Sequence, residues 1–323
     1  MMFEKRTLGR TGFRVSEIGY GAWPIGNNDA YDYGSINEEE AKAVVRAYLE
    51  EGGNFIDTAR GYGERSERII GTVIKELGCR EKVYIATKSV GGQTVDTIPG
   101  LRVDLEESLR LLQTNYVDVF QLHQPPEEPE VMNRVLDEME NLRQEGKIRA
   151  IGASIKGANV TRKTENLCYQ YMDTGRLDAI QLVYSILRPR MRSVIAEAKT
   201  RNVGIIVRTA LESGLLTGKY KPGHRFTGID QRTRYKPENL EFILRTVQEI
   251  ERIVTEGPYS NLAQAAIRFA LLPDGVSTVI VGAHTVRHIQ ANAATGHSPP
   301  LSKKLVESLL SKYGDLTDKC NYH

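Results

Sequence analysis

The sequence predicts an α/β protein of the (β/α)8 barrel class, and two observations carry this prediction. Short apolar segments rich in β-branched and aromatic residues alternate eight times with longer segments of helical periodicity. This alternation indicates a parallel sheet, because each strand must return through a crossover, and eight such units favour closure into a barrel. The rival is a doubly wound sheet, but the turn Gly19–Pro24 lacks the third glycine of a dinucleotide fingerprint.

The expected strands are short apolar runs bounded by polar or turn-forming residues. In chain order they are Glu17–Gly21, Asn54–Asp57, Val83–Lys88, Val117–His123, Ile148–Ser154, Ala179–Val183, Gly204–Arg208 and Ser277–Val281.

The expected helices between the strands carry apolar residues at helical spacing. In the first helix Ala41, Val44 and Tyr48 share one face, and Ser35 with Glu38 is interpreted as a capping box at its start. The helices are expected at Asn37–Glu51, Ser66–Leu77, Val103–Leu112, Val131–Gln144, Ala158–Gly175, Met191–Thr200, Leu240–Glu256 and Val286–Thr295.

Four segments lie outside the eight units. Phe3–Val15, with a Gly-Arg-Thr-Gly turn, is expected to form a hairpin that closes the bottom of the barrel. Lys221–Asn239 is a polar loop, Ser260–Leu272 an extra helix, and Leu301–His323 a short helix with a tail. Since no linker divides the chain, residues 1–323 are expected to form one domain.

Composition excludes several classes of protein. The 323 residues include 43 Lys+Arg and 41 Asp+Glu, a formal net charge of +2. Binding that depends on phosphate neutralisation needs a basic surplus, so we expect no nucleic-acid partner. Hydrophobic residues at 40% and charged residues at 26% argue against broad disorder.

Cysteine usage and the apolar pattern indicate a cytoplasmic setting. The three cysteines are too few and too scattered for a disulfide framework or a zinc cluster, so no metal is expected. The first residues are charged and lack the apolar core of a signal peptide. No apolar run approaches the about 18 residues of a membrane-spanning helix, so we expect no membrane partner.

Polar residues of complementary chemistry end three neighbouring strands. Active sites of such barrels lie at the C-terminal ends of the strands. The second strand ends at Asp57, the third at Lys88 and the fourth at His123, and Tyr62 follows Asp57 in the next loop. An acid, an ammonium, an imidazole and a phenol are therefore expected on one rim.

Together these four groups form an apparatus for protonating a carbonyl oxygen as hydride reaches its carbon. An ammonium lowers the pKa of a neighbouring phenol, which is ordinarily about 10, and a carboxylate holds the ammonium in place. Taken singly, each has a plainer interpretation: Asp57 as a helix cap, Lys88 as a surface residue, His123 as a core histidine and Tyr62 as packing. Their convergence favours the catalytic interpretation.

Several motifs resemble those of the aldo-keto reductases. The segment Gly53–Gly63 followed by Ser66-Glu67 resembles the first signature of that family. Ile85–Lys88, Asp118–His123 and the opening Arg6–Gly12 resemble further pieces, in the family's order and spacing. The resemblance implies a (β/α)8 barrel that binds NADP(H) without a Rossmann domain and reduces carbonyls.

The resemblance also assigns catalytic roles. It makes Tyr62 the proton donor in reduction, Lys88 the group that lowers the pKa of Tyr62, Asp57 the partner of Lys88, and His123 the group that orients the carbonyl. Trp23, Arg60, Tyr62 and His123 are the expected substrate contacts, although Trp23 could instead pack the barrel top. Tyr31, Tyr33 and the loop Gln124–Pro129 are further candidates for the pocket lining.

The resemblance also carries over cofactor contacts, position by position, from six strands and the loops that follow them. They are Gly21, Ala22, Trp23, Asp57, Ser154, Gln181, Arg208, Thr209, Leu211, Ser213, Gly214, Leu216, Lys219, Gly282, His284, His288 and Asn292. Arg225 and Arg232 are further candidate phosphate contacts, with a solvated loop as the alternative.

Departures from the family pattern affect the cofactor expectation. Ile155 replaces a polar residue that follows Ser154 in relatives, and Arg208 stands where most relatives place an aromatic. The guanidinium could favour an anionic group or alter the potential of the cofactor. With Ala291 in place of a frequent adenine-binding Glu, NADPH/NADP+ is the preferred cofactor and NADH a possible one.

Two functions from different classes follow from the resemblance. The first is an NADPH-dependent oxidoreductase that reduces an aldehyde or ketone, reversibly, with a sugar or another hydroxylated carbonyl among the candidate small-molecule substrates. The alternative is an NADPH-binding regulatory or redox-sensor protein that resembles potassium-channel β-subunits. The tetrad is retained in both, so it does not separate them.

Overall fold

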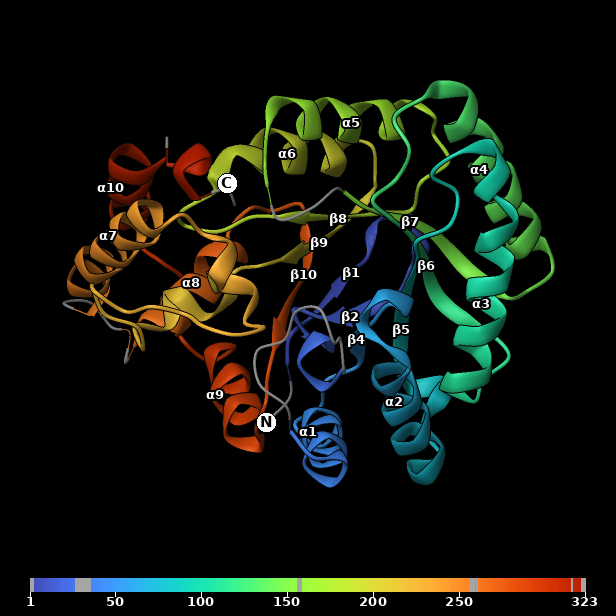
Figure 1. Cartoon of the computed structure of the whole chain (residues 1–323), viewed down its shortest axis with the longest axis horizontal. Helices are drawn as coiled ribbons and strands as arrows, with labels where there is room; N and C mark the ends of the chain where they lie inside the picture. The colour runs from blue at the N-terminus through green and yellow to red at the C-terminus, as the bar shows by residue number, and fades with distance from the viewer. Residues whose placement is uncertain are drawn as a thin grey trace.

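Eight parallel strands close into a barrel, as the sequence predicts. The computed structural model describes residues 3–26, 36–155, 159–255, 259, 261–314 and 316–320. Around the barrel the strands follow the order β10-β3-β4-β5-β6-β7-β8-β9, so the last strand pairs with the first and closes the sheet (Figure 1). Their bounds are β3 Ile18–Gly21, β4 Phe55–Asp57, β5 Tyr84–Ser89, β6 Val117–His123, β7 Ile148–Ser154, β8 Ala179–Val183, β9 Gly204–Arg208 and β10 Val276–Gly282.

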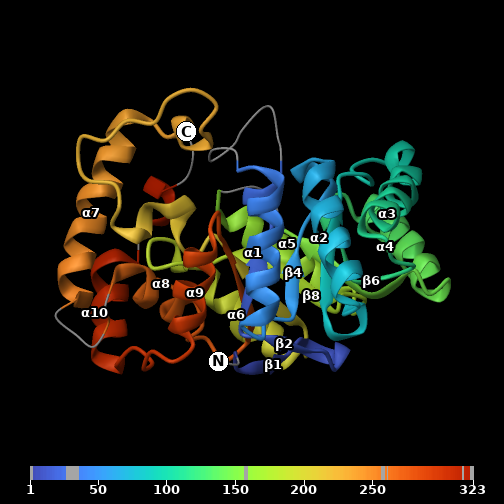
Figure 2. The same ribbon diagram turned by 90° about the horizontal axis from the view of Figure 1, so that it is seen from below.

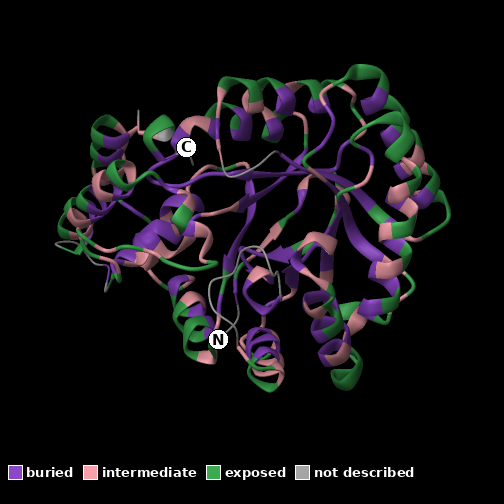
Figure 3. Cartoon of the chain, in the orientation of Figure 1, coloured by how far each residue is buried: buried purple, intermediate pink, exposed green. Residues whose placement is uncertain are grey.

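Helices surround the barrel and return the chain from each strand to the next (Figure 1). Because they pack against the sheet on one side only, their buried residues lie along one face (Figure 3). Among the described residues, no helix is long and apolar enough to cross a membrane. The bounds are α1 Glu38–Glu50, α2 Glu64–Leu77, α3 Pro99–Leu112, α4 Pro129–Gln144, α5 Arg162–Asp173, α6 Arg192–Thr200, α7 Pro237–Thr255, α8 Leu262–Ala270, α9 Val286–Thr295 and α10 Lys303–Tyr313.

The helix starts are where the sequence prediction is least accurate. Three helices begin at a proline ahead of the first expected apolar residue, namely α3 at Pro99, α4 at Pro129 and α7 at Pro237. Proline fits the first helical position because its fixed φ suits the helix. The backbone N–H that proline lacks would have no acceptor within the helix at that position. The extra helix expected before the last strand is confirmed as α8.

The capping box of α1 differs from the predicted one. Asn37, not Ser35, is the N-cap: its side chain accepts from the backbone N–H of Glu40, and the Glu40 carboxylate accepts from the backbone N–H of Asn37. Asparagine caps a helix as well as serine does, and the box needs an acid three residues after the cap. Ser35, with Tyr31 and Tyr33, lies outside the described residues.

An antiparallel hairpin closes one end of the barrel, as the sequence predicts. Strands β1 (Lys5–Thr7) and β2 (Arg14–Ser16) pair there, at the end opposite to the segment between β9 and α7 (Figure 2). Leu8, Phe13 and Val15 pack on an apolar layer inside the barrel. That layer consists of Phe55, Ala86, Val119, Ala150, Ala179, Ile206 and Ile280.

The polar residues of the site lie on the same strands, two residues closer to the C-terminal end than the apolar layer. Side chains two residues apart in a strand point to the same side of the sheet. On five strands the residue two positions after a floor residue is polar. These five residues are Asp57, Lys88, Gln121, Gln181 and Arg208. The fold therefore places an apolar floor below a polar layer at the C-terminal end of the barrel.

Candidate active site

A buried ion pair joins the ends of β4 and β5. Lys88 Nζ lies 2.5 Å from Asp57 Oδ1 and also donates to the backbone oxygen of Thr58 at 2.8 Å. Both charged side chains are fully buried. Burial disfavours the ammonium, but Asp57 and Tyr62 outweigh that effect and raise the pKa of Lys88 above its ordinary value. Lys88 therefore carries a positive charge in the barrel interior.

The phenol of Tyr62 takes the third hydrogen of this ammonium. Lys88 Nζ lies 3.1 Å from Tyr62 Oη, and Tyr62 ends the short 3-10 helix η3 (Arg60–Tyr62). The ring of Trp23 packs edge-on against the Tyr62 ring, with centroids 4.8 Å apart. The sequence predicts a lowered pKa for this phenol. Burial instead raises the pKa of Tyr62, and the charge of Lys88 offsets only part of the rise.

The imidazole of His123 is neutral and faces the same phenol. The two rings are perpendicular, with centroids 6.1 Å apart. Burial, together with the charges of Lys88 and Arg208, lowers the pKa of His123 to about 3. Its Nδ1 is buried and makes no hydrogen bond within the described part of the chain. A neutral ring can donate a hydrogen bond without carrying a charge.

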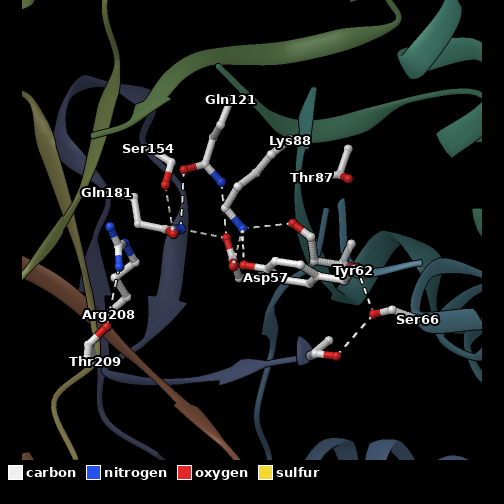
Figure 4. Close-up of polar contacts among 12 residues, drawn as sticks. Asp57, Tyr62, Ser66, Thr87, Lys88, Gln121, Ser154, Gln181, Arg208 and Thr209 are labelled. Atoms are coloured by element: carbon white, nitrogen blue, oxygen red, sulfur yellow. Dashed lines mark hydrogen bonds and ion pairs between the residues drawn. The ribbon is translucent and has the colours of Figure 1, made fainter. Parts of the chain in front are cut away.

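Two glutamine amides complete the shell of Asp57 (Figure 4). Asp57 Oδ2 accepts from Gln121 Nε2 at 3.0 Å and from Gln181 Nε2 at 2.7 Å. Gln181 Oε1 in turn accepts from Ser154 Oγ at 3.2 Å. The sequence-based prediction did not include Gln121, although a signal existed, since Gln121 shares a strand face with His123 in β6.

Glu67 is a second residue that sequence analysis missed. Its carboxylate is fully buried on α2, where it accepts from Thr87 Oγ1 at 2.6 Å and from Arg60 at 2.9 Å. Thr87 precedes Lys88, and Arg60 opens the turn that carries Tyr62. Glu67 therefore fixes the two segments that bear the phenol and the ammonium. The signal was its place in the Ser66-Glu67 motif.

The end of β3 lies beside Asp57. Gly21 pairs with Asp57 on one side and with Gly282 on the other. The backbone N–H of Ala22 donates to the Asp57 carbonyl oxygen at 2.8 Å, and Ser66 Oγ lies 3.1 Å from the carbonyl oxygen of Ala22. The first strand end is thus tied to the tetrad.

The loop after β9 has an unusual backbone. Thr209, Glu212 and Ser213 have φ values of 63°, 48° and 55°, and Gly214 has φ of 87°. These angles are left-handed and are costly for residues other than glycine. Arg208 precedes the loop and donates to the backbone oxygen of Ile155 at 3.0 Å.

A buried ion pair holds this loop in place. Arg188 donates to Glu212 from Nε at 2.9 Å and from a terminal nitrogen at 2.5 Å, and both side chains are buried. Ser185 Oγ also contacts the carboxylate. The surrounding structure thus determines the strained φ of Glu212. The neighbouring Leu211 and Leu216 pack on the core.

Arg232 differs from the solvated loop residue that sequence analysis considered. It is buried, and its guanidinium binds the Asp230 carboxylate, the Ser213 carbonyl oxygen at 3.1 Å and the Tyr220 hydroxyl at 2.8 Å. These contacts make Arg232 a brace for the loop after β9. Lys219 is exposed, with Nζ 5.4 Å from the centroid of the Tyr220 ring.

The end of β10 leads into the N-terminus of α9. Thr285 caps this helix, because its side chain accepts from the backbone N–H of His288 at 3.2 Å. The backbone N–H of His284 donates to His288 Nδ1 at 3.4 Å. Burial and the charges of Lys219 and Arg287 lower the pKa of His288. Gly282 is exposed and Asn292 half-buried on this segment.

Comparisons with known proteins bear on the family and on the barrel fold. The model of the aldo/keto reductase family matches residues 17–313. Aldo-keto reductase YhdN of Bacillus subtilis (strain 168) is 32% identical over 89% of this chain and 87% of that protein. A probable voltage-gated potassium channel subunit beta of Oryza sativa subsp. japonica is 30% identical over 94% of each chain. The holo form of aldo-keto reductase AKR11C1 from Bacillus halodurans is 25% identical, with a TM-score of 0.76 over 95% of this chain and 96% of that one.

Proposed function

The chain belongs to the aldo/keto reductase family, a family of oxidoreductases, and on that premise we propose that it reduces aldehyde or ketone carbonyls with NADPH. One observation carries the proposal. The three hydrogens of Lys88 point to Asp57, to Thr58 and to the phenol of Tyr62, and a neutral His123 faces that phenol. This arrangement can give a proton to a carbonyl oxygen and stabilise the phenolate that remains.

The donors around the barrel rim fit a nicotinamide dinucleotide. Ser154 Oγ and Gln181 Oε1 offer a donor and an acceptor to a primary amide. The loop Thr209–Gly214 has four residues of positive φ, and turns of this kind can present backbone N–H groups to an anion, so it is the proposed place of the pyrophosphate. Lys219 and the α9 N-terminus with His284 and His288 suit a phosphate anion. Bound NADPH would supply hydride to the carbonyl carbon.

The side chains of the site would then divide the work. Tyr62 gives its proton to the carbonyl oxygen, and Lys88 stabilises the phenolate by direct contact. Asp57 holds Lys88 in place, and its charge is shared with two amide donors. His123 donates a hydrogen bond to the same carbonyl oxygen, and Trp23 and Arg60 line the substrate pocket beside Tyr62. In oxidation of an alcohol Tyr62 takes the proton back.

Multiple-turnover oxidation of NADPH tests the proposal. The purified protein is mixed with NADPH and a panel of aldehydes, ketones, sugars and hydroxylated carbonyls, and absorbance at 340 nm is followed. We expect many turnovers per active site with at least one class. NADH in parallel tests the coenzyme preference that Arg208 and Ala291 leave open. Tight NADPH binding without turnover on any substrate would exclude the enzymatic function.

A cofactor-binding regulatory protein is the second candidate. The observation that favours it is the 30% identity to a probable potassium channel subunit beta over nearly the whole chain. Such a protein would bind NADPH through the same residues and oxidise it in a single turnover at most. The same assay therefore separates the two functions.

A further inference from the structure

The Asp57 carboxylate is a branch point between two parts of the site. Its Oδ1 accepts from Lys88, which also reaches the phenol of Tyr62. Its Oδ2 accepts from Gln121 and from Gln181. Asp57, Lys88 and both glutamines are fully buried, so water does not compete for these bonds. One branch therefore ends on the proton donor, and the other ends on Ser154 (Figure 4).

The carboxylate fixes which way each amide faces. A carboxylate has no hydrogen to give, so the Gln181 amide must turn its nitrogen toward Asp57 and its oxygen away. That oxygen accepts from Ser154 Oγ. The Gln181 nitrogen also donates to Gln121 Oε1 at 3.3 Å. This bond fits an arrangement in which both amides turn their nitrogen toward Asp57. Gln181 thus accepts from Ser154 through its oxygen and donates to Asp57 through its nitrogen.

We propose, on the basis of the proposed function, that Gln181 links the cofactor site to the proton donor, because its oxygen faces the amide site beside Ser154 while its nitrogen binds Asp57. Gln181 and Gln121 are then positioning residues that act through Asp57 and Lys88 on Tyr62. Hydrogen bonds in a buried chain polarise one another. A donor at the Gln181 oxygen strengthens the bond that its nitrogen gives to Asp57 and draws negative charge from that carboxylate.

The direction of the effect follows from the charges that face Tyr62. These are Lys88 from β5, Asp57 from β4 and Arg208 from β9, with the neutral ring of His123 from β6. The negative charge of Asp57 opposes ionisation of the phenol and so raises the pKa of Tyr62. Drawing charge from Asp57 weakens this opposition. A cofactor amide bound at Gln181 therefore makes Tyr62 a stronger acid.

Three residues of the chain separate the two branches. Within the described residues, Gln121 hydrogen-bonds to Asp57 and to Gln181 but not to Ser154, Ser154 hydrogen-bonds to Gln181 but not to Asp57, and Gln181 hydrogen-bonds to both Asp57 and Ser154. The variants are Gln121→Met, Ser154→Ala and Gln181→Met, with Gln121→Leu and Gln181→Leu as alternates if a methionine variant fails to fold. The dissociation constant of NADPH is measured by fluorescence without substrate. The pKa of Tyr62 is measured by NMR on protein labelled with tyrosine carrying carbon-13 at Cζ, and Tyr62→Phe assigns its signal.

The link predicts a distinct pattern for each variant. Gln121→Met raises the pKa of Tyr62 by roughly half a unit, the size of one lost hydrogen bond, and leaves NADPH affinity within about twofold. Ser154→Ala weakens NADPH binding by about tenfold and, because it removes a donor at the Gln181 oxygen but keeps both bonds to Asp57, raises the pKa of Tyr62 by less than Gln121→Met does. Gln181→Met does both. In steady-state turnover, the high-pH limb of the kcat/KM profile moves to higher pH in Gln121→Met and Gln181→Met.

A pair of ligands tests the link in the unaltered protein. NADP+ and its 3-acetylpyridine analogue carry the same charge, but the analogue has a methyl group in place of the amide NH2. We expect a lower pKa of Tyr62 with NADP+ than with the analogue. An equal pKa with both bound ligands, or an unchanged pKa in Gln121→Met and Gln181→Met, overturns the link. Failure to bind either ligand would contradict the proposed function and not the link. The link would still be tested by the pKa of Tyr62 in Gln121→Met and Gln181→Met, which is measured without cofactor.

Discussion

At the scale of single residues, the site depends on how burial and charge compete. Tyr62, Lys88 and His123 lie within one polar layer, yet burial acts differently on each. For Lys88 the neighbouring Asp57 and Tyr62 outweigh burial, so the ammonium persists. For Tyr62 and His123 burial is the larger effect, and both groups stay neutral over the ordinary pH range. A neutral proton donor beside a fixed cation is the state that carbonyl reduction requires.

Tyr62→Phe tests the proton donor. We expect reduction to fall below a tenth of the normal rate, a loss of at least about 1.4 kcal/mol of barrier stabilisation, because Tyr62 is the acid that Lys88 contacts in the described part of the chain. NADPH affinity should stay nearly unchanged, since the lost hydroxyl contacts Lys88. Steady-state kinetics and fluorescence titration measure the two quantities. A variant that kept more than a tenth of the activity would show that another group donates the proton.

His123 gives a prediction on pH. Its folded pKa of about 3 lies below the ordinary 6.5, so the unfolded chain binds a proton that the folded protein does not. The contribution of His123 to the free energy of unfolding is complete above pH 6.5 and declines as the pH falls toward 3. Urea denaturation at stepped pH should show this slope, and His123→Gln should reduce it. Equal slopes in both proteins would mean that the imidazole charges freely in the fold.

At the scale of elements, short loops at the strand ends are held by buried ion pairs. The left-handed residues after β9 are fixed by Arg188 and Glu212, and Arg232 braces the same loop through Ser213 and Tyr220. On the other side of the site Glu67 joins α2 to β5 and to η3. These contacts join elements distant in sequence, and they hold the rim in a defined shape.

Glu212→Ala should destabilise the protein strongly. It leaves the Arg188 guanidinium buried without its carboxylate, which costs about 3–5 kcal/mol. The double variant Arg188→Met/Glu212→Leu removes both charges and should recover most of the loss. Urea denaturation measures both, with Glu38→Ala, from the partly exposed pair with Arg68, as the control that should change little. A single variant as stable as the unaltered protein would exclude the pair as a structural support.

At the scale of the whole molecule, stability and chemistry lie at opposite ends of one barrel. The hairpin and the apolar floor close one end, and the polar layer begins one side-chain step above them. Because the floor faces the hairpin and the site lies at the C-terminal ends of the strands, changes at the floor should alter stability and spare the site. That residues 1–323 form one domain stays a prediction.

Leu8→Ala tests this division. Leu8 is fully buried beneath the barrel, so its truncation should cost about 2–5 kcal/mol of unfolding free energy. The rate of carbonyl reduction and the affinity for NADPH should remain within about twofold below the new unfolding temperature. Leu77→Ala removes the side chain of an exposed leucine and is the matched control. It should change neither the unfolding free energy nor the activity. A loss of activity in the still-folded Leu8 variant would show that the two ends are coupled.

The sequence by itself determined the barrel and the positions of its eight strands, and it proposed Asp57, Tyr62, Lys88 and His123 as the catalytic residues, a role that stays a prediction. Periodicity and strand-end chemistry are local properties, readable within a few residues of each position, and the family motifs are contiguous. Only the tertiary structure decided the places of Gln121, Glu67 and Arg232 and the direction of the Tyr62 pKa shift. Each depends on groups brought together from separate strands and on the balance of burial against charge, which the distances between folded segments determine.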